Sequence, residues 1–169
     1  MGSIMQANTL PRLDTSVNTT GCCPKFNPDG WDGVALQLRD LPVLRARTRS
    51  VMHLPLNMGK VFGRVQTHLQ QAGTQAQAVL SSDLSPWQDE HLFVVDGPVS
   101  GEEMATLSGD FVTRVFEGPY GRAKHWMREL RDMSRARGKP DGRAFFYYTT
   151  CPKCAKTYGK NYVVGFAEV

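Results

Sequence analysis

An internal repeat is the feature of this sequence that most limits its fold. Residues 51–69 (VMHLPLNMGKVFGRVQTHL) align with residues 115–133 (VFEGPYGRAKHWMRELRDM) at an offset of 64 residues. The alignment pairs these positions: His53 with Glu117, Pro55 with Pro119, Lys60 with Lys124, and Phe62 with Trp126. Each segment opens as a strand and continues as a helix, so the chain is expected to contain two copies of one unit.

The flanking residues extend each copy to a β-α-β-β unit. Alternating apolar residues at 43–52 and 106–116 predict half-buried strands. Two apolar stripes at helical spacing then predict helices: Val61, Val65, His68 and Leu69 in the first copy, and Trp126, Met127, Leu130 and Met133 in the second. Strand pairs follow at 76–83 and 91–97, joined by a loop at 84–90, and at 143–150 and 161–169, joined by a loop at 151–160.

The predicted fold class is α+β, with duplicated β-α-β-β halves at about residues 40–98 and 104–169. Every strand alternates and needs helix on one face alone, which favours one antiparallel curved sheet with two helices. The free face is expected to form a central ligand groove along a pseudo-twofold axis. A duplication also stabilises a fold without any ligand. Residues 1–20 are polar and aperiodic and are expected to be a disordered segment before a single domain at 21–169.

Composition excludes several classes of protein. With 169 residues, 41% of them hydrophobic and 21% charged, the chain suits one globular domain. It contains no apolar run of membrane-spanning length and no secretory signal pattern, so no membrane partner and a cytoplasmic location are expected. The net charge is +4, but the basic run at 122–139 is interleaved with acids, which favours a solvated helix face over a nucleic-acid partner. The polar residues 1–20 also argue against a helix-turn-helix.

Several motifs give the sequence a family resemblance. The duplication, the EGPY at 117–120 and the aromatic strand before a Pro-containing loop resemble the GyrI-like (SOUL-like) small-molecule-binding domains. The segments GCCPKFNPDGWDG (21–33), HLPLNMGKVFGRV (53–65) and YYTTCPKCAKTYGKNYVV (147–164) are similar to a subgroup labelled as hydrolases. This resemblance covers residues 21–169. It implies hydrolysis of the cyclopropane ring of duocarmycin-type DNA-alkylating antibiotics.

One position departs from the drug-sensing members of that family. They carry a buried Glu two residues before a Tyr on the penultimate strand, with a Pro four residues after the Tyr. Counted back from Pro152, the Tyr is Tyr148 and the Glu position holds Phe146. An aromatic pair there favours neutral, flat aromatic ligands over cations, because each ring pair contributes roughly 0.5 to 1.5 kcal/mol beyond its buried area. All four aromatics at 145–148 could equally be core residues.

The candidate catalytic residues are Glu117, Tyr148 and His53. The repeat places His53 opposite Glu117, and a carboxylate facing an imidazole can transfer a proton between them. The ligand that the resemblance implies is a spirocyclopropyl-cyclohexadienone, and ring opening places negative charge on its dienone oxygen. Tyr148 or His53 would donate a hydrogen bond to that oxygen, while Glu117 would position the attacking water or accept its proton. The candidate substrate-binding residues are Phe146, Trp126, Tyr120, Trp31 and Phe62. Trp31 lies in an irregular segment that could fold over the groove, and Phe62 and Trp126 could instead be core residues.

The four cysteines form two pairs, Cys22 with Cys23 and Cys151 with Cys154. Packing, a zinc site and redox chemistry all remain open for them. Adjacent cysteines rarely direct both thiolates at one ion, so no metal ligand and no cofactor are assigned. The Gly-rich phosphate loop, the G-x-S-x-G elbow and HExxH do not occur in the sequence.

These observations favour a detoxifying or self-resistance hydrolase that adds water to a strained cyclopropane inside an aromatic enclosure. The alternative is a non-catalytic xenobiotic-binding module that sequesters or senses its ligand, and a zinc-stabilised interaction domain is a third hypothesis. The sequence sets neither the natural ligand nor the oligomeric state.

Overall fold

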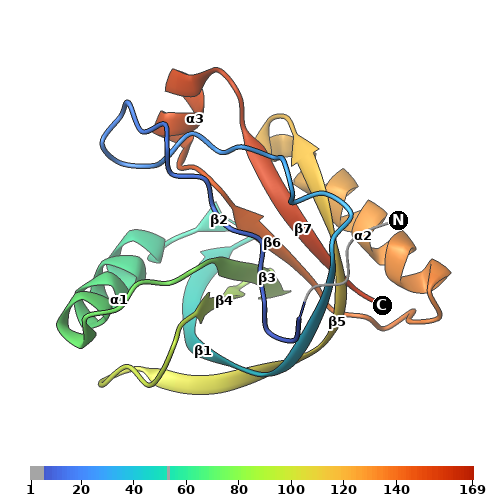
Figure 1. The fold of residues 1–169 in the computed structure, drawn as a ribbon, viewed down its shortest axis with the longest axis horizontal. Coiled ribbons are helices and arrows are strands. Elements are labelled where there is room, and N and C mark those ends of the chain that lie inside the picture. The colour runs from blue at the N-terminus through green and yellow to red at the C-terminus, as the bar shows by residue number, and fades with distance from the viewer. Residues whose placement is uncertain (1–5, 53) are drawn as a thin grey trace. The chain divides into compact units, whose positions relative to one another are not determined.

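The computed structural model describes residues 6–52 and 54–169 (Figure 1). Its elements, in chain order, are β1 (Ala35–Val51), β2 (Leu54–Pro55), α1 (Met58–Ala72), β3 (Val79–Ser85), β4 (Gln88–Val94), β5 (Glu103–Glu117), the 3-10 helix η1 (Tyr120–Arg122), α2 (Ala123–Ala136), β6 (Ala144–Tyr148), α3 (Pro152–Tyr158) and β7 (Tyr162–Glu168). The mixed α and β class and the antiparallel pairing are confirmed. The β-α-β-β order occurs twice, from β1 to β4 and from β5 to β7, with β2, η1 and α3 added.

Two compact units make up the chain, one of residues 40–108 and one that combines residues 6–39 with 109–169. In the first unit the strand order is β2-β1-β4-β3, all antiparallel, with Val43 opposite Val94 and Leu80 opposite Leu92. In the second unit β7 lies between β6 and β5, again antiparallel. Within the described residues, no helix has the length and apolarity needed to cross a membrane.

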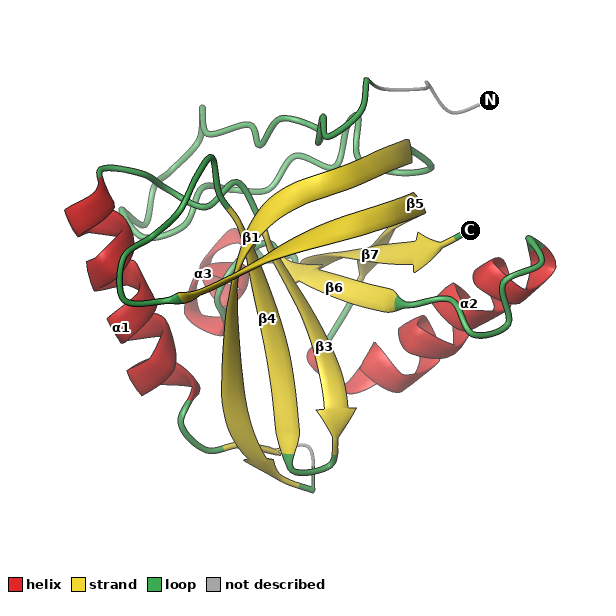
Figure 2. Cartoon of the chain, turned by 90° about the horizontal axis from the view of Figure 1, so that it is seen from below, coloured by secondary structure: helices red, strands yellow, loops and turns green. Residues whose placement is uncertain are grey.

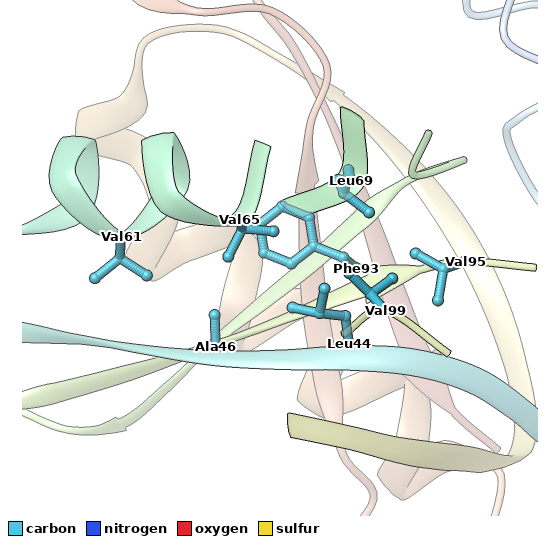
Figure 3. Packing of buried hydrophobic residues seen from close by; sticks show 8 residues of the cluster. All are labelled: Leu44, Ala46, Val61, Val65, Leu69, Phe93, Val95 and Val99. Atoms are coloured by element: carbon cyan, nitrogen blue, oxygen red, sulfur yellow. The ribbon is translucent and has the colours of Figure 1, made fainter. Parts of the chain in front are cut away.

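The core of the 40–108 unit forms between α1 and its sheet, as Figure 3 shows. Helix α1 buries Val61, Val65 and Leu69, which are three of the four residues of the predicted stripe. They pack on Leu44 of β1 and Phe93 of β4. The fourth residue of the stripe, His68, is partly buried and hydrogen-bonds Glu102 through Nδ1 at 2.6 Å. The spacing of apolar residues therefore predicted the buried face of α1 correctly.

The core of the second unit lies between α2 and the β6-β7-β5 sheet. Figure 2 shows this helix and these strands. Helix α2 buries Trp126 and Leu130 against Phe116, Phe146 and Val163. The Trp126 ring stacks on Phe116 with centroids 5.3 Å apart and planes at 12°. This helix face also agrees with the predicted stripe.

Two predicted loops are in fact regular structure. Residues 84–90 were expected to be a loop, but β3 and β4 meet in a tight hairpin with Pro86 and Trp87 between them. The predicted loop included Asp89 and Glu90, but these residues belong to β4 and their side chains hydrogen-bond residues of β1. The loop at 151–160 contains the helix α3, which Cys151 precedes in an extended conformation and Gly159 ends with φ 79°. The described residues thus hold three α-helices, not two.

The segment 6–34 has no helix or strand but is held to its own unit. The Asn8 side chain bonds the backbone of Arg39 in both directions, at 2.7 and 2.8 Å, and Leu10 is 8% exposed. Near its end, Phe26 and Trp31 are buried, and Gly33 and Val34 pair with Thr113 of β5. Residues 6–20 were expected to be disordered; Asn8 bonds Arg39 and Leu10 is buried, and the expectation of disorder stays a prediction. The rest of that prediction, residues 1–5, lies outside the described residues.

Candidate functional site

The EGPY turn after β5 borders a cavity of about 570 Å³. It is lined by Glu117, Gly118, Pro119, Tyr120, Ala155, Lys156, Gly159, Lys160 and Asn161. One wall is therefore the end of β5 and η1, and the other is α3 with the turn that follows it. The hollow is largely open to solvent, so these two walls would contact a ligand without enclosing it.

Glu117 and Lys160 place opposite charges at this cavity. The Glu117 carboxylate lies 3.8 Å from the Lys160 ammonium, and both side chains are about half exposed. Each group therefore remains accessible to a ligand or to water. A carboxylate can accept a proton from water, while Lys160 and Lys156 can stabilise negative charge that develops on a bound molecule. Sequence reasoning missed both lysines, although they lie in the CPKCAKTYGKNYVV segment.

Asn161 fixes the backbone of the turn. Its side-chain amide donates to the Gly118 carbonyl at 2.8 Å, and the Gly118 N–H donates to the Asn161 carbonyl at 3.1 Å. Asn161 Oδ1 is buried and has no hydrogen-bond partner among the described residues. Because buried acceptors are usually paired, this oxygen is an exception to the usual pattern.

Two tyrosines form an aromatic edge beside the cavity. The Tyr120 hydroxyl donates to the Thr150 carbonyl at 2.8 Å, and its ring centroid lies 5.9 Å from that of Tyr148. Burial raises the pKa of Tyr120, so its hydroxyl stays neutral at physiological pH. Tyr148 is 43% exposed and therefore offers ring surface to a ligand.

Successive side chains of β6 point to opposite sides of the sheet, as predicted. The side that carries Phe146 was expected to form the groove, but it is the side that lies under the helix. Phe146 is 5% exposed and packs against Trp126 of α2, so the Phe146 face lies beneath the helix. Phe145 contacts Phe111, and Tyr147 contacts Trp31 on the opposite face. Phe146 still touches Tyr148 edge-on at 5.9 Å, so it supports the aromatic edge from inside the core.

Trp31 is fixed in the structure. It was expected in a segment that folds over the groove, but it is 1% exposed and packs between Phe26 and Tyr147. Burial raises the pKa of Tyr147 to about 12, which keeps this neighbour neutral. The Trp31 side chain thus anchors the irregular segment to β6.

Of the two predicted site residues in the first repeat, the structure describes Phe62 alone. Phe62 packs edge-on against His91 at 4.9 Å and against Phe93 at 5.2 Å, inside the 40–108 unit. His53 lies outside the described residues. A proton pair between His53 and Glu117 therefore stays a prediction.

A buried polar cluster in the 40–108 unit was not foreseen. His91 is 2% exposed, with Nε2 2.9 Å from the Thr48 hydroxyl and Nδ1 2.8 Å from the Ser81 hydroxyl. Burial lowers the pKa of His91, so the ring is neutral. The nearby Asp89 accepts from Ser50 at 2.8 Å. Asp89 and His91 are two residues apart, so on a strand they share a face. This spacing could have indicated the cluster, but the sequence prediction placed Asp89 in a loop.

All four cysteines converge in the unit of residues 6–39 and 109–169. The sulfurs of Cys22, Cys23, Cys151 and Cys154, here called the cysteine cluster, all lie within 4.8 Å of one another. The expectation that two adjacent cysteines would not face one point is wrong for this chain. The Cys22 and Cys23 N–H groups both donate to the Thr20 hydroxyl, at 3.2 and 3.4 Å, and Gly21 adopts φ 72°, so the backbone turns sharply there.

Polar neighbours hold the cysteine cluster together. The Tyr158 hydroxyl of α3 donates to the Cys23 carbonyl at 2.6 Å, and the Cys154 thiol lies 3.3 Å from the Thr20 hydroxyl. Hydrogen bonding to Thr20 lowers the pKa of Cys154 to about 6, whereas burial raises the pKa of Cys23 to about 12. The four cysteines are free thiols, and the cluster is compatible with a metal ion or a dithiol pair.

A family model described as "Bacterial hydrolase" matches residues 13–169, which includes both units and the cysteine cluster. No curated protein matches the chain.

Proposed function

The chain belongs to the bacterial hydrolase family, and from this membership we propose that the cavity beside Glu117 is its hydrolytic site. We propose as its substrate a flat aromatic compound with a strained cyclopropane ring, of the duocarmycin type, which the resemblance to the GyrI-like hydrolase subgroup suggests. The family supports a hydrolase-type function, and the substrate class is the proposal.

The observation that carries this proposal is the position of Glu117 in a cavity of about 570 Å³. The carboxylate is half exposed, a cation lies 3.8 Å away, and Tyr120 lines the same cavity. An acid, a cation and an aromatic wall are the groups that water addition to a flat electrophile requires.

The proposed reaction adds one water molecule. Glu117 accepts a proton as the water oxygen attacks the cyclopropane methylene carbon and forms a C–O bond. The ring C–C bond breaks, and its electron pair moves through the dienone to the carbonyl oxygen, which becomes a phenolate. Lys160 or Lys156 stabilises that charge, and a proton from the protonated Glu117 or from solvent completes the phenol.

The aromatic residues hold the ligand flat in this proposal. Tyr148 presents its exposed ring beside Tyr120, and Phe146 and Trp126 support Tyr148 from the core. The Tyr148 hydroxyl and His53 remain the alternative donors to the dienone oxygen. Trp31 and Phe62 remain proposed as substrate-binding residues; Trp31 is buried, and Phe62 is partly buried in the core of the 40–108 unit.

The test is to incubate the purified protein with a duocarmycin-type cyclopropane compound and to follow the ligand by liquid chromatography and mass spectrometry. We expect catalytic gain of one water over many turnovers. Glu117→Gln should reduce the turnover rate by about a hundredfold or more, the usual loss when a general base is removed. The matched control is Glu129→Gln, because Glu129 is an exposed carboxylate of the same unit that pairs with Arg114 instead.

Each alternative result has a separate meaning. Unchanged ligand that co-elutes with the protein would replace the hydrolase by a non-catalytic module that sequesters or senses xenobiotics. Full turnover in Glu117→Gln would remove Glu117 from the mechanism and leave enclosure as the catalytic device. A small-molecule partner and a cytoplasmic location, which four free thiols favour, are part of the same proposal.

A further inference from the structure

We propose that the cysteine cluster binds one zinc ion, and that this site ties the irregular segment 6–34 to α3. The four ligands would be Cys22, Cys23, Cys151 and Cys154. The site lies in one compact unit and is separate from the groups proposed to react with the substrate.

The sulfur positions match a tetrahedral site. With a Zn–S bond of about 2.3 Å, two sulfurs on one zinc ion are about 3.8 Å apart. The Cys22 and Cys23 sulfurs are 3.7 Å apart, and all six separations in the cluster are at most 4.8 Å. A small contraction around a central ion would therefore complete the tetrahedron without moving the backbone turn.

The ligand set selects the metal and its role. Four thiolates form a soft donor set, which favours zinc over magnesium or calcium. They also fill every position of a tetrahedral ion, so no position is left for water or substrate. The ion would consequently be structural, and the proposed reaction at Glu117 does not pass through it.

Both pairs of ligands are held by their own local structure. Cys22 and Cys23 project from the turn around Thr20, while Cys151 and Cys154 are spaced by the first turn of α3. The Tyr158 hydroxyl joins the two parts through the Cys23 carbonyl at 2.6 Å. Partners of this kind orient ligands around a metal and are part of a built site.

The segment 6–34 has little regular structure to hold it in place. It has no helix or strand, and between Leu10 and Phe26 a backbone–backbone hydrogen bond joins Lys25 to Val17. Figure 1 shows this segment passing beside α3. A metal ion that binds only the folded chain adds its binding free energy to the stability of the fold. It would therefore hold the segment and the helix together. Because Ala155, Lys156 and Gly159 line the cavity, the zinc ion would also support one wall of the proposed active site.

The first experiment is metal analysis of the full chain, purified without a histidine tag and without chelators, by elemental mass spectrometry and native mass spectrometry. We expect one zinc per chain. Cys22→Ser and Cys154→Ser should each lose most of the zinc. The matched control is Lys153→Ser, because Lys153 is exposed between two ligands and supplies no sulfur. Cys22→His should keep zinc, because a ring nitrogen can replace an exposed thiolate.

Cobalt substitution tests the site in the unmutated protein, so its result does not depend on whether a variant folds. Unmutated protein stripped of metal and loaded with Co²⁺ should show the intense visible bands and thiolate charge-transfer absorption of a tetrahedral sulfur site. Iron in place of zinc, a chain without metal that shows no such cobalt spectrum, or cysteines found paired as disulfides after alkylation under denaturing conditions would each overturn the proposal. Zinc retained by both Cys→Ser variants would overturn it as well.

Discussion

Gly165 on β7 provides the space that Leu130 of α2 occupies. A Cβ atom at position 165 would lie 2.7 Å from both Cδ atoms of Leu130 and 2.8 Å from the Phe116 ring. Carbon atoms do not approach so closely without displacement, so the absence of a side chain at 165 sets how near α2 lies to the sheet. The contact belongs to the core that supports Trp126 and Phe146.

Gly165→Ala is therefore expected to destabilise the protein by about 1 to 3 kcal/mol, because it overpacks a filled core. Gly63→Ala on the exposed side of α1 is the control, since a Cβ there meets no atom within 4 Å. That control should be neutral or more stable by roughly 0.5 to 1 kcal/mol, the helix preference of Ala over Gly. Urea unfolding followed by circular dichroism measures both. Equal stabilities would mean that α2 can shift to accept the methyl group.

Glu168 gives the stability a pH dependence at acid pH. Its carboxylate bonds Arg143 at 2.9 and 3.1 Å, and this partner lowers the pKa of Glu168 from 4.5 to about 2. A lowered pKa in the folded state means that the contribution is complete above pH 4.5 and is lost as the pH falls toward 2. Glu168→Gln should cost about 1 to 3 kcal/mol at neutral pH, and the difference from the unmutated protein should shrink over that interval. The exposed pair lost in Glu129→Gln should cost less than about 1 kcal/mol.

His91 gives a second pH dependence, at higher pH. Burial lowers its pKa below the usual 6.5, so the folded state resists protonation that the unfolded chain accepts. Its contribution is therefore present above pH 6.5 and falls as the pH decreases from there. His91→Gln should remove this part of the slope, whereas His125→Gln, which removes an exposed imidazole of α2, should keep it. Thermal unfolding midpoints between pH 7.5 and 5 provide the test, and an unchanged slope in His91→Gln would contradict it.

Variants at Tyr148 and Phe146 should distinguish an effect on ligand binding from an effect on stability. Tyr148→Leu removes a ring that is 43% exposed, so it should weaken binding of a flat aromatic ligand about tenfold and change stability little. Phe146→Leu alters a residue that is 5% exposed in contact with Trp126, so stability should fall by about 1 kcal/mol or more. Fluorescence titration with the ligand and urea unfolding of both variants measure the two effects. A loss of binding in Phe146→Leu alone would instead place the ligand against Phe146.

Local pattern determined the secondary structure of this protein to a large extent. The buried faces of α1 and α2 follow from apolar residues spaced three and four apart. Such periods act within one turn or one pleat, so they can be read without knowing the fold. The errors at 84–90 and 151–160 have a local cause as well, because both segments are polar and contain Pro. At 84–90 the polar side chains have partners on the neighbouring strand, and at 151–160 the Pro begins a helix.

Tertiary structure alone decided which faces and side chains meet. A strand pattern does not state which side lies beneath a helix, and only the packing of α2 placed Phe146 there and Tyr147 against Trp31. Likewise, Cys22 and Cys154 are distant in the chain and become neighbours because the Thr20 turn and α3 are brought together. The sequence by itself determined the order of the two β-α-β-β units, without β2, η1 and α3, and the glutamate at the end of β5. The cavity around it, the His91 cluster and the cysteine cluster depend on contacts between residues remote in the chain, which local periodicity does not encode.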